Sequence, residues 1–289
     1  MLWFGKQAKS SGGGGDGDAI VPGQLEVTFD KDIAGSKLDD LLKLASERSS
    51  TLEVFTEALG LKREMFQRLL PPEKTEAAFS RDGFNAVLET VFPARRKLGE
   101  TFAALSDEEL QDAVLTLVYG EGPIGDRMAA FCELVPKDKE HRKARRAIWD
   151  LAAELLHFRD PDRIPLMTRW VWDVNTSTGA LREFIRGNDS METIPLEPRP
   201  EIFEGARVWF AEFLGERGFY RDLPFLVDLL QAHAYSDYVK AMSSRIGMID
   251  AEFGAKHDPL ELVLKLLGID VRTRDLKEAG SGDQQPTLH

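Results

Sequence analysis

Two pairs of histidine and carboxylate residues have the spacing of metal ligands on helices. The segment ELLH places Glu154 and His157 three positions apart, and HAYSD places His233 and Asp237 four positions apart. Residues with either spacing share one face of a helix. Helical di-iron proteins use the first spacing to point a glutamate and a histidine inward. The four side chains could therefore form half or more of a site for iron or another divalent metal.

A helical wheel separates the two pairs. At about 100° per residue, Glu154 and His157 lie roughly 120° and 180° from the centre of the apolar face of their helix. We expect them to be solvated or to point at a neighbouring helix. His233 and Asp237 belong to a helix that is apolar nearly all round, so we expect both to be buried.

Two interpretations of His233 and Asp237 stay open. They form either a hydrogen-bonded pair that fixes packing, or a ligand or acid–base pair in a pocket. A full di-iron site needs a second Glu-x-x-His motif, and the sequence contains none. We expect no cofactor, and iron or another divalent metal only if these residues form a site with Glu154 and His157.

A basic cluster lies in the segment 137–146. Its cations are Lys137, Lys139, Arg142, Lys143, Arg145 and Arg146. Cations at a helix N-terminus oppose the helix dipole by roughly a few tenths of a kcal/mol each. The cluster is either a solvated helix face or a surface for an acidic partner. Under the second interpretation, the partner-binding residues are Arg142, Lys143, Arg145 and Arg146.

The first residues combine an apolar tip with a linker. Leu2, Trp3 and Phe4 precede a glycine-rich stretch that is expected to be flexible. A tether of this kind raises the effective concentration of a docking peptide at a nearby groove. We expect the tip to dock on a partner protein, with a membrane surface as the alternative.

The segment TLEVFTEALGLKREMFQRLL has the rhythm of a helix-turn-helix motif. Its second helix would present Lys62, Arg63 and Arg68. Interspersed glutamates make this face less basic than that of a DNA-binding domain, so ordinary packing of two helices is the favoured interpretation.

Three further residues have side chains that merit interpretation. Cys132 lies in an apolar helix, where a buried inert thiol is expected. Trp170 and Trp172, in RWVWD, belong to a predicted helix and are expected to lie in the core, although one of them could be an interface anchor.

Composition limits the class of protein. The 289 residues carry a net charge of −12, with 43% hydrophobic and 30% charged residues and a single cysteine. This charge repels phosphate backbones and argues against nonspecific binding of nucleic acid. No apolar run reaches the length of roughly 18 residues that a transmembrane helix needs. We expect a cytoplasmic protein.

The predicted elements are almost all helical. About ten helices are expected in an all-α, irregular bundle, with at most one short strand at 25–29. We divide the chain into a flexible N-terminal tail with an apolar tip (1–24), an N-terminal helical region (25–135), a C-terminal helical region (136–271) and a disordered tail (272–289). The two helical regions are either separate subdomains or parts of one domain.

The sequence contains no complete catalytic constellation, so we expect binding rather than catalysis. The favoured function is a non-catalytic, protein-binding adaptor or assembly factor. The alternatives are a helical metalloenzyme or small-molecule binder that uses Glu154, His157, His233 and Asp237, and, third, a helix-turn-helix DNA binder.

Overall fold

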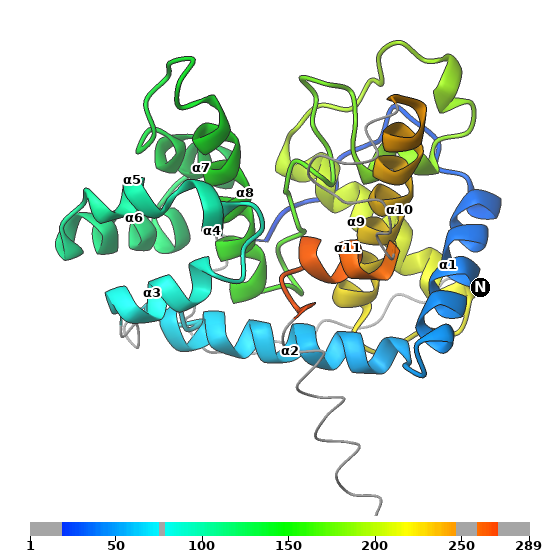
Figure 1. The fold of residues 1–289 in the computed structure, drawn as a ribbon, viewed down its shortest axis with the longest axis horizontal. Coiled ribbons are helices and arrows are strands. Elements are labelled where there is room, and N and C mark those ends of the chain that lie inside the picture. The colour runs from blue at the N-terminus through cyan, green and yellow to red at the C-terminus, as the bar shows by residue number, and fades with distance from the viewer. Residues whose placement is uncertain (1–18, 75–78, 247–258, 271–289) are drawn as a thin grey trace, which may run out of the picture.

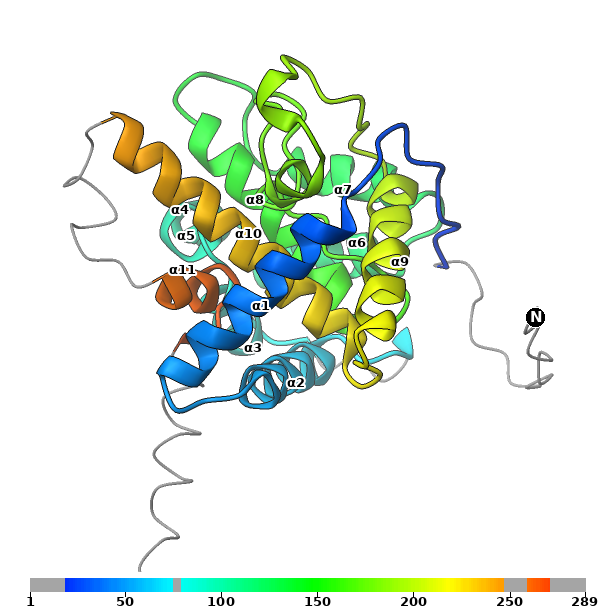
Figure 2. The same cartoon turned by 90° about the vertical axis from the view of Figure 1, so that its right-hand side faces the viewer.

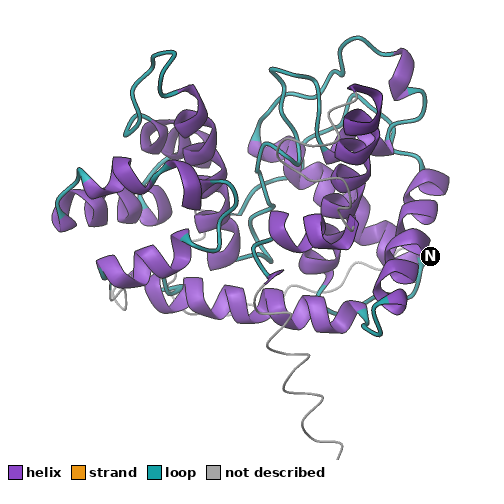
Figure 3. Cartoon of the chain, in the orientation of Figure 1, coloured by secondary structure: helices purple, strands orange, loops and turns teal. Residues whose placement is uncertain are grey.

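The computed structural model describes residues 19–74, 79–246 and 259–270. The predicted docking tip, Leu2 to Phe4, and the predicted tail 272–289 lie outside these residues. Within the described part of the chain, every regular element is a helix, which confirms the all-α prediction (Figure 3). At the predicted strand 25–29 there is only an isolated bridge, between Phe29 and Ile185.

The helices follow the chain in this order: α1 (Lys31–Glu47), α2 (Leu52–Leu69), α3 (Arg81–Leu88), α4 (Ala94–Lys97), α5 (Gly99–Ala103), α6 (Asp107–Tyr119), α7 (Ile124–Cys132), α8 (Arg142–Arg159), the 3-10 helices η3 (Ala180–Phe184) and η4 (Asn188–Ser190), α9 (Pro200–Glu216), α10 (Leu223–Ile246) and α11 (Pro259–Leu266).

The long helix α2 runs along the lower edge of the molecule beneath two groups of helices (Figure 1). One group contains α3 to α8, and the other contains α1, α9, α10 and α11 (Figure 1). When the molecule is viewed from the right-hand side of Figure 1, helices α1, α9 and α10 of the second group lie in front (Figure 2). Helix α8 packs against α2, α4, α6 and α7, whereas α10 packs against α1, α9, α11 and η3. The position between residues 135 and 136, which separates the two helical regions of the sequence analysis, lies between α7 and α8, and these two helices contact each other directly.

Local sequence signals account for several helix ends. Ser106 followed by acidic residues predicts the start of α6, and the structure places a complete capping box of Ser106 and Glu109 there. The capping box that Ser50 or Thr51 and Glu53 predict at the start of α2 is not formed, because the side chain of Thr51, the cap residue, makes no capping hydrogen bond. After α11, Gly268 adopts a φ of +65°, a conformation that favours glycine.

A glycine after a helical pattern predicts a helix end, and the sequence predicts one at Gly60. This prediction is wrong, because α2 continues through Gly60 to Leu69. A mid-helix glycine costs only about 1 kcal/mol relative to alanine, so buried residues on both sides of Gly60 can keep the helix intact. The segment therefore contains no turn between two helices, as a helix-turn-helix motif would require.

The segment around Trp170 and Trp172 is not the predicted helix. The carbonyls of Trp170 and Val171 accept hydrogen bonds from the amides of Ala180 and Leu181, and Asp173 pairs with Thr178. These bonds to residues further along the chain replace the local bonds of a helix. The segment 169–178 therefore forms a fixed loop against the start of η3.

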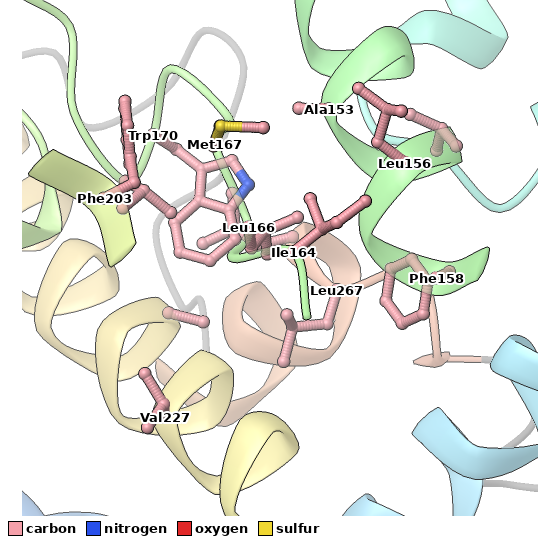
Figure 4. Close-up of a cluster of buried hydrophobic side chains, with 14 of the residues drawn as sticks. Ala153, Leu156, Phe158, Ile164, Leu166, Met167, Trp170, Phe203, Val227 and Leu267 are labelled. Atoms are coloured by element: carbon pink, nitrogen blue, oxygen red, sulfur yellow. The ribbon is translucent and has the colours of Figure 1, made fainter. Parts of the chain in front are cut away.

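Both tryptophans of this loop lie in the core, as predicted. Trp170 is 5% and Trp172 2% exposed. Figure 4 shows Trp170 near Leu166, Met167 and Phe203, with Leu156 and Phe158 of α8 on the other side of the cluster. Cys132 is buried, as predicted, and burial raises the pKa of its thiol to about 12.

Helices long and apolar enough to cross a bilayer are not found among the described residues.

Candidate functional site: a basic, aromatic-walled cleft

A cavity of about 550 Å³ opens beside the first turns of α8. The loop that contains Arg169 and Asp173 and the start of α9 supply the rest of its lining. Five cations and two carboxylates are among the residues that line it, which are Lys137, Asp138, Arg142, Arg145, Arg146, Trp149, Arg169, Trp172, Asp173, Val174, Asn175, Pro198 and Phe203. The cleft is therefore locally basic in a chain whose net charge is −12.

Two indole rings form fixed walls of the cleft. The Nε1–H of Trp149 donates to the Met167 carbonyl at 2.9 Å, and that of Trp172 donates to the Leu196 carbonyl at 2.9 Å. Because both N–H groups already bond to backbone carbonyls, the rings offer carbon surface rather than donors to an occupant. Phe203 and Pro198 add to this apolar surface.

The cations of the cleft fall into two groups. Arg145 donates to the Val135 carbonyl at 2.7 Å, and Lys137 pairs with Glu133 at 2.8 Å. These contacts tie both side chains to the end of α7. Arg142 and Arg146, by contrast, are exposed and make no hydrogen bond or ion pair with any of the residues that the structure describes. They are the cations that the cleft can offer to a ligand.

Of the four predicted partner-binding cations, the structure brings three together. Arg142, Arg145 and Arg146 line the cleft, whereas Lys143, which lies between them in sequence, is exposed outside it. Arg145 serves the packing of α7 through the bonds described above, which leaves Arg142 and Arg146 as the functional candidates.

Arg169 and Asp173, which also line the cleft, form an ion pair. Arg169 binds the same Asp173 oxygen through Nη2 at 2.5 Å and Nε at 3.1 Å. Burial raises the pKa of Asp173, but the Arg169 guanidinium and Asn175 outweigh this effect and hold the pKa below its usual value. Asp173 is thus a charged, paired group rather than a proton donor.

Asp150 is the buried acid next to this pair. Its Oδ1 accepts a hydrogen bond from the Arg169 amide at 2.7 Å. Burial, with smaller contributions from Glu154 and Asp173, raises the pKa of Asp150 to about 7. Its charge therefore changes near neutral pH.

Glu154 and His157 are both buried, each only 1% exposed. The expectation of solvent exposure is wrong, and the alternative, contact with a neighbouring helix, is confirmed. Glu154 pairs with Lys62 of α2 at 2.5 Å, and His157 Nε2 lies 2.9 Å from Asp228 of α10. Two helices cover the polar side of α8 and bring a charged partner for each side chain.

The Lys62–Glu154 pair is a structural centre. The Lys62 ammonium also donates to the carbonyls of Leu267 at 2.8 Å and Thr90 at 3.2 Å, and it lies 4.2 Å from the centroid of the Phe158 ring. Burial raises the pKa of Glu154, and Lys62 opposes this effect. Lys62 is 0% exposed, so it cannot contact DNA as the helix-turn-helix interpretation would require.

His233 is buried as predicted, but Asp237 is not, because its side chain is 37% exposed. The His233 Nε2 and Asp237 Oδ2 atoms lie 3.5 Å apart without hydrogen-bond geometry, and neither ring nitrogen has a partner among the described residues. Lys37 of α1 approaches Asp237 at 3.4 Å instead. Burial lowers the pKa of His233.

The four predicted ligands therefore do not meet in one site. Glu154 pairs with Lys62, His157 pairs with Asp228, and His233 lies beside Asp237. Among the residues described, no group of three or more histidine, cysteine, aspartate or glutamate side chains is placed to hold a metal ion. The basic side of the cleft is visible in the sequence. Trp149 and Arg169 of the cleft, and Asp150 beside it, were not predicted as site residues. The spacing of Arg146, Trp149 and Asp150 along one helix was an available signal, since residues three and four apart are neighbours.

Comparison with protein family models, with curated proteins and with solved structures finds no match to the chain.

Proposed function

We propose that the protein is a non-catalytic binding protein that holds an acidic segment of a partner protein in the cleft beside α8. The observation that carries the proposal is the position of Arg142 and Arg146. Neither has an ion-pair partner among the described residues, and both line an aromatic-walled cavity in an acidic chain.

Charge complementarity favours an acidic occupant. Arginine binds carboxylates through two parallel N–H bonds, and its guanidinium is less strongly hydrated than an ammonium. The remaining cations of the cleft, Lys137, Arg145 and Arg169, add positive potential even though they have partners of their own. Desolvated charge pairs at the centre of an interface are worth more than exposed ones at its edge.

A segment of a partner fits this molecule better than a broad acidic surface. The chain as a whole is negative, so a large acidic face would meet repulsion outside the cleft. A short segment places its carboxylates next to the arginines and its apolar atoms against Trp149 and Trp172. A cytoplasmic location fits this function, because a chain with one cysteine suits a reducing compartment.

The docking tip at Leu2, Trp3 and Phe4 stays a prediction and forms a second element of the proposal. Bound to the same partner, a tethered peptide would increase the overall affinity without changing the cleft.

Charge reversal tests the cleft. We expect Arg142→Glu combined with Arg146→Glu to weaken binding of a fluorescein-labelled glutamate-rich peptide at least tenfold, as measured by anisotropy at low salt, because two attractive contacts become repulsive. The midpoint of thermal unfolding should stay nearly unchanged, since neither side chain has a partner to lose among the described residues.

The double variant Lys139→Glu with Lys143→Glu is the matched control, because it changes the net charge by the same amount. Both lysines are exposed, and neither lines the cleft. We expect this control to reduce affinity less than threefold. Equal losses in both variants would show that only the overall charge matters and would refute the cleft as the binding site.

A further inference from the structure

A second cavity, of about 340 Å³, adjoins the cleft. Three residues, Arg146, Arg169 and Asp173, line both cavities, so the two share a wall. The other lining residues come from the loop before α4 and from α8, α10, α11 and the loop 169–178, and they are Phe92, Pro93, Asp150, Trp170, Thr176, Thr178, Tyr235, Val239, Leu262 and Leu266.

The second cavity has an apolar part and a polar part, which contains two arginines, two aspartates and two threonines. Phe92, Pro93, Val239, Leu262 and Leu266 contribute carbon surface from three separate parts of the chain. The ring of Trp170 packs 6.3 Å from that of Tyr235, centroid to centroid, which adds two aromatic rings to the lining. A cavity of this volume is at the lower end of the range for ligand pockets, and it has room for one aromatic side chain.

Two of the three residues in the shared wall, Arg169 and Asp173, are held by hydrogen bonds. Asp173 is held by Arg169 and by the bond from its amide to the Thr178 carbonyl at 2.8 Å, and the Arg169 amide is held by Asp150. Arg146 is the residue of this wall that has no hydrogen bond or ion pair with the described part of the chain. A cation that is free to pair thus lies between the open basic cleft and a second cavity with mixed apolar and polar walls.

We propose that the second cavity takes an aromatic side chain of the partner segment, while carboxylates next to that side chain pair with Arg146 and Arg142. The partner segment is then an acidic peptide with a central aromatic residue rather than a purely acidic one. This inference rests on the proposed function of the cleft and adds a sequence requirement for the partner.

Two peptides and one filled cavity test the requirement. The first probe is a labelled glutamate-rich peptide with one central phenylalanine, and the second has alanine at that position. Burial of an aromatic ring predicts that the phenylalanine peptide binds wild-type protein about tenfold more tightly or better. Val239→Phe fills part of the second cavity from α10 and should remove this preference while leaving the affinity for the alanine peptide within about twofold.

Ala241→Phe is the control, since Ala241 is an exposed residue of the same helix outside the cavity, and it should preserve the preference. Val239→Ala, which enlarges the cavity, should also preserve it. The unchanged affinity of Val239→Phe for the alanine peptide shows that the larger variant is still folded. If Val239→Phe still prefers the phenylalanine peptide, this inference is overturned. The cleft proposal then stays intact, provided that charge reversal at Arg142 and Arg146 still lowers the affinity for both peptides. A different outcome would also overturn the inference. If wild-type protein binds the two peptides equally, and if it binds free hydrocinnamate while Val239→Phe does not, the cavity is a site for a small molecule.

Discussion

Lys62 and Glu154 show how strongly one buried pair can constrain a helical protein. The ammonium contacts a carboxylate of α8, the carbonyl that follows α11 and the carbonyl of Thr90 before α4. Removing one member of such a pair leaves an uncompensated charge in the core, which is more costly than removing both. The energetic value of the pair is therefore measured only by comparing single and double variants.

Lys62→Met should lower the free energy of unfolding by about 3–5 kcal/mol, because Glu154 then stays buried without its cation. Adding Glu154→Leu should recover a large part of this loss, although the carbonyls of Leu267 and Thr90 still lack their donor. Urea unfolding of the two single variants and the double variant measures the coupling. Strictly additive losses would contradict a coupled pair.

The buried carboxyl group of Asp150 should make the stability of the protein depend on pH near neutrality. The pKa of its carboxyl rises from an ordinary value of 3.8 to about 7 in the folded protein. Between these two values the folded state holds a proton that the unfolded state has lost, so this group destabilises the protein by up to about 1.4 kcal/mol for each unit that the pH rises. The contribution to stability is fully present below the unfolded pKa and is lost as the pH passes 7.

Asp150→Asn removes this dependence and keeps an oxygen that can accept from the Arg169 amide. The stability of the variant relative to wild type should therefore increase steadily from pH 5 to pH 7 and level off above pH 7. Chemical unfolding at several pH values measures the difference. Parallel stability curves across this range would show that the carboxyl titrates normally.

At the scale of helices, α2 illustrates how packing overrides a local signal. Gly60 follows a stretch that reads as a complete helix, yet the chain continues as helix to Leu69. A side chain added at Gly60 would meet no atom within 4 Å. The glycine is tolerated there, and the backbone does not require it.

Gly60→Ala should therefore raise the free energy of unfolding by about 0.5–1 kcal/mol, because alanine favours the helix and restricts the unfolded chain. Gly268→Ala is the opposite case. Its φ is +65°, and a Cβ would lie 1.7 Å from the Thr90 carbonyl oxygen, so this variant should be clearly destabilised. Thermal unfolding of both variants distinguishes a glycine that the fold needs from one that it tolerates.

Local features were predictable from residue type and neighbouring sequence, and contacts between distant segments were not. The cap at Ser106 and the burial of Trp170 and Trp172 follow from residue type and neighbouring sequence. The burial of Glu154 and His157 does not, because a helical wheel assumes one core-facing side and α8 is covered on both. Lys62 and Asp228, which make that burial tolerable, are far away in sequence.

The same distinction applies to the candidate site. Four of the five cations of the cleft lie in the stretch 137–146, so their clustering is visible in the sequence, whereas Arg169 comes from a distant loop. The residues that turn them into a binding site, such as Trp172 and Phe203, reach the cleft through bonds to distant carbonyls and through the packing of α9. The predicted helix over residues 166–174 failed for the same reason, since its backbone bonds to residues 178–181 instead.

For the whole molecule, a basic cleft in a negative chain makes the kinetics of binding informative. At long range an acidic peptide meets net repulsion, and close to the cleft it meets attraction, so the two effects oppose each other during approach. We expect the association rate constant to change little between 50 and 300 mM salt, while the dissociation rate constant rises as the arginine contacts are screened. Stopped-flow anisotropy separates the two rate constants. An association rate that falls steeply with salt would mean that steering by the cleft dominates the field of the whole chain.

The bond from Lys62 to the Leu267 carbonyl joins residues that are 205 positions apart. A ribosome adding about 5–20 residues per second needs about 10–40 seconds to make that stretch. During this interval the nascent α2 carries a lysine whose carboxylate partner, Glu154, arrives 92 residues later and whose acceptor at Leu267 arrives 205 residues later. Helix α2 therefore cannot complete its native contacts until Leu267 has been made. The buried surroundings of Lys62 are consequently assembled only after α11 has left the ribosomal exit tunnel.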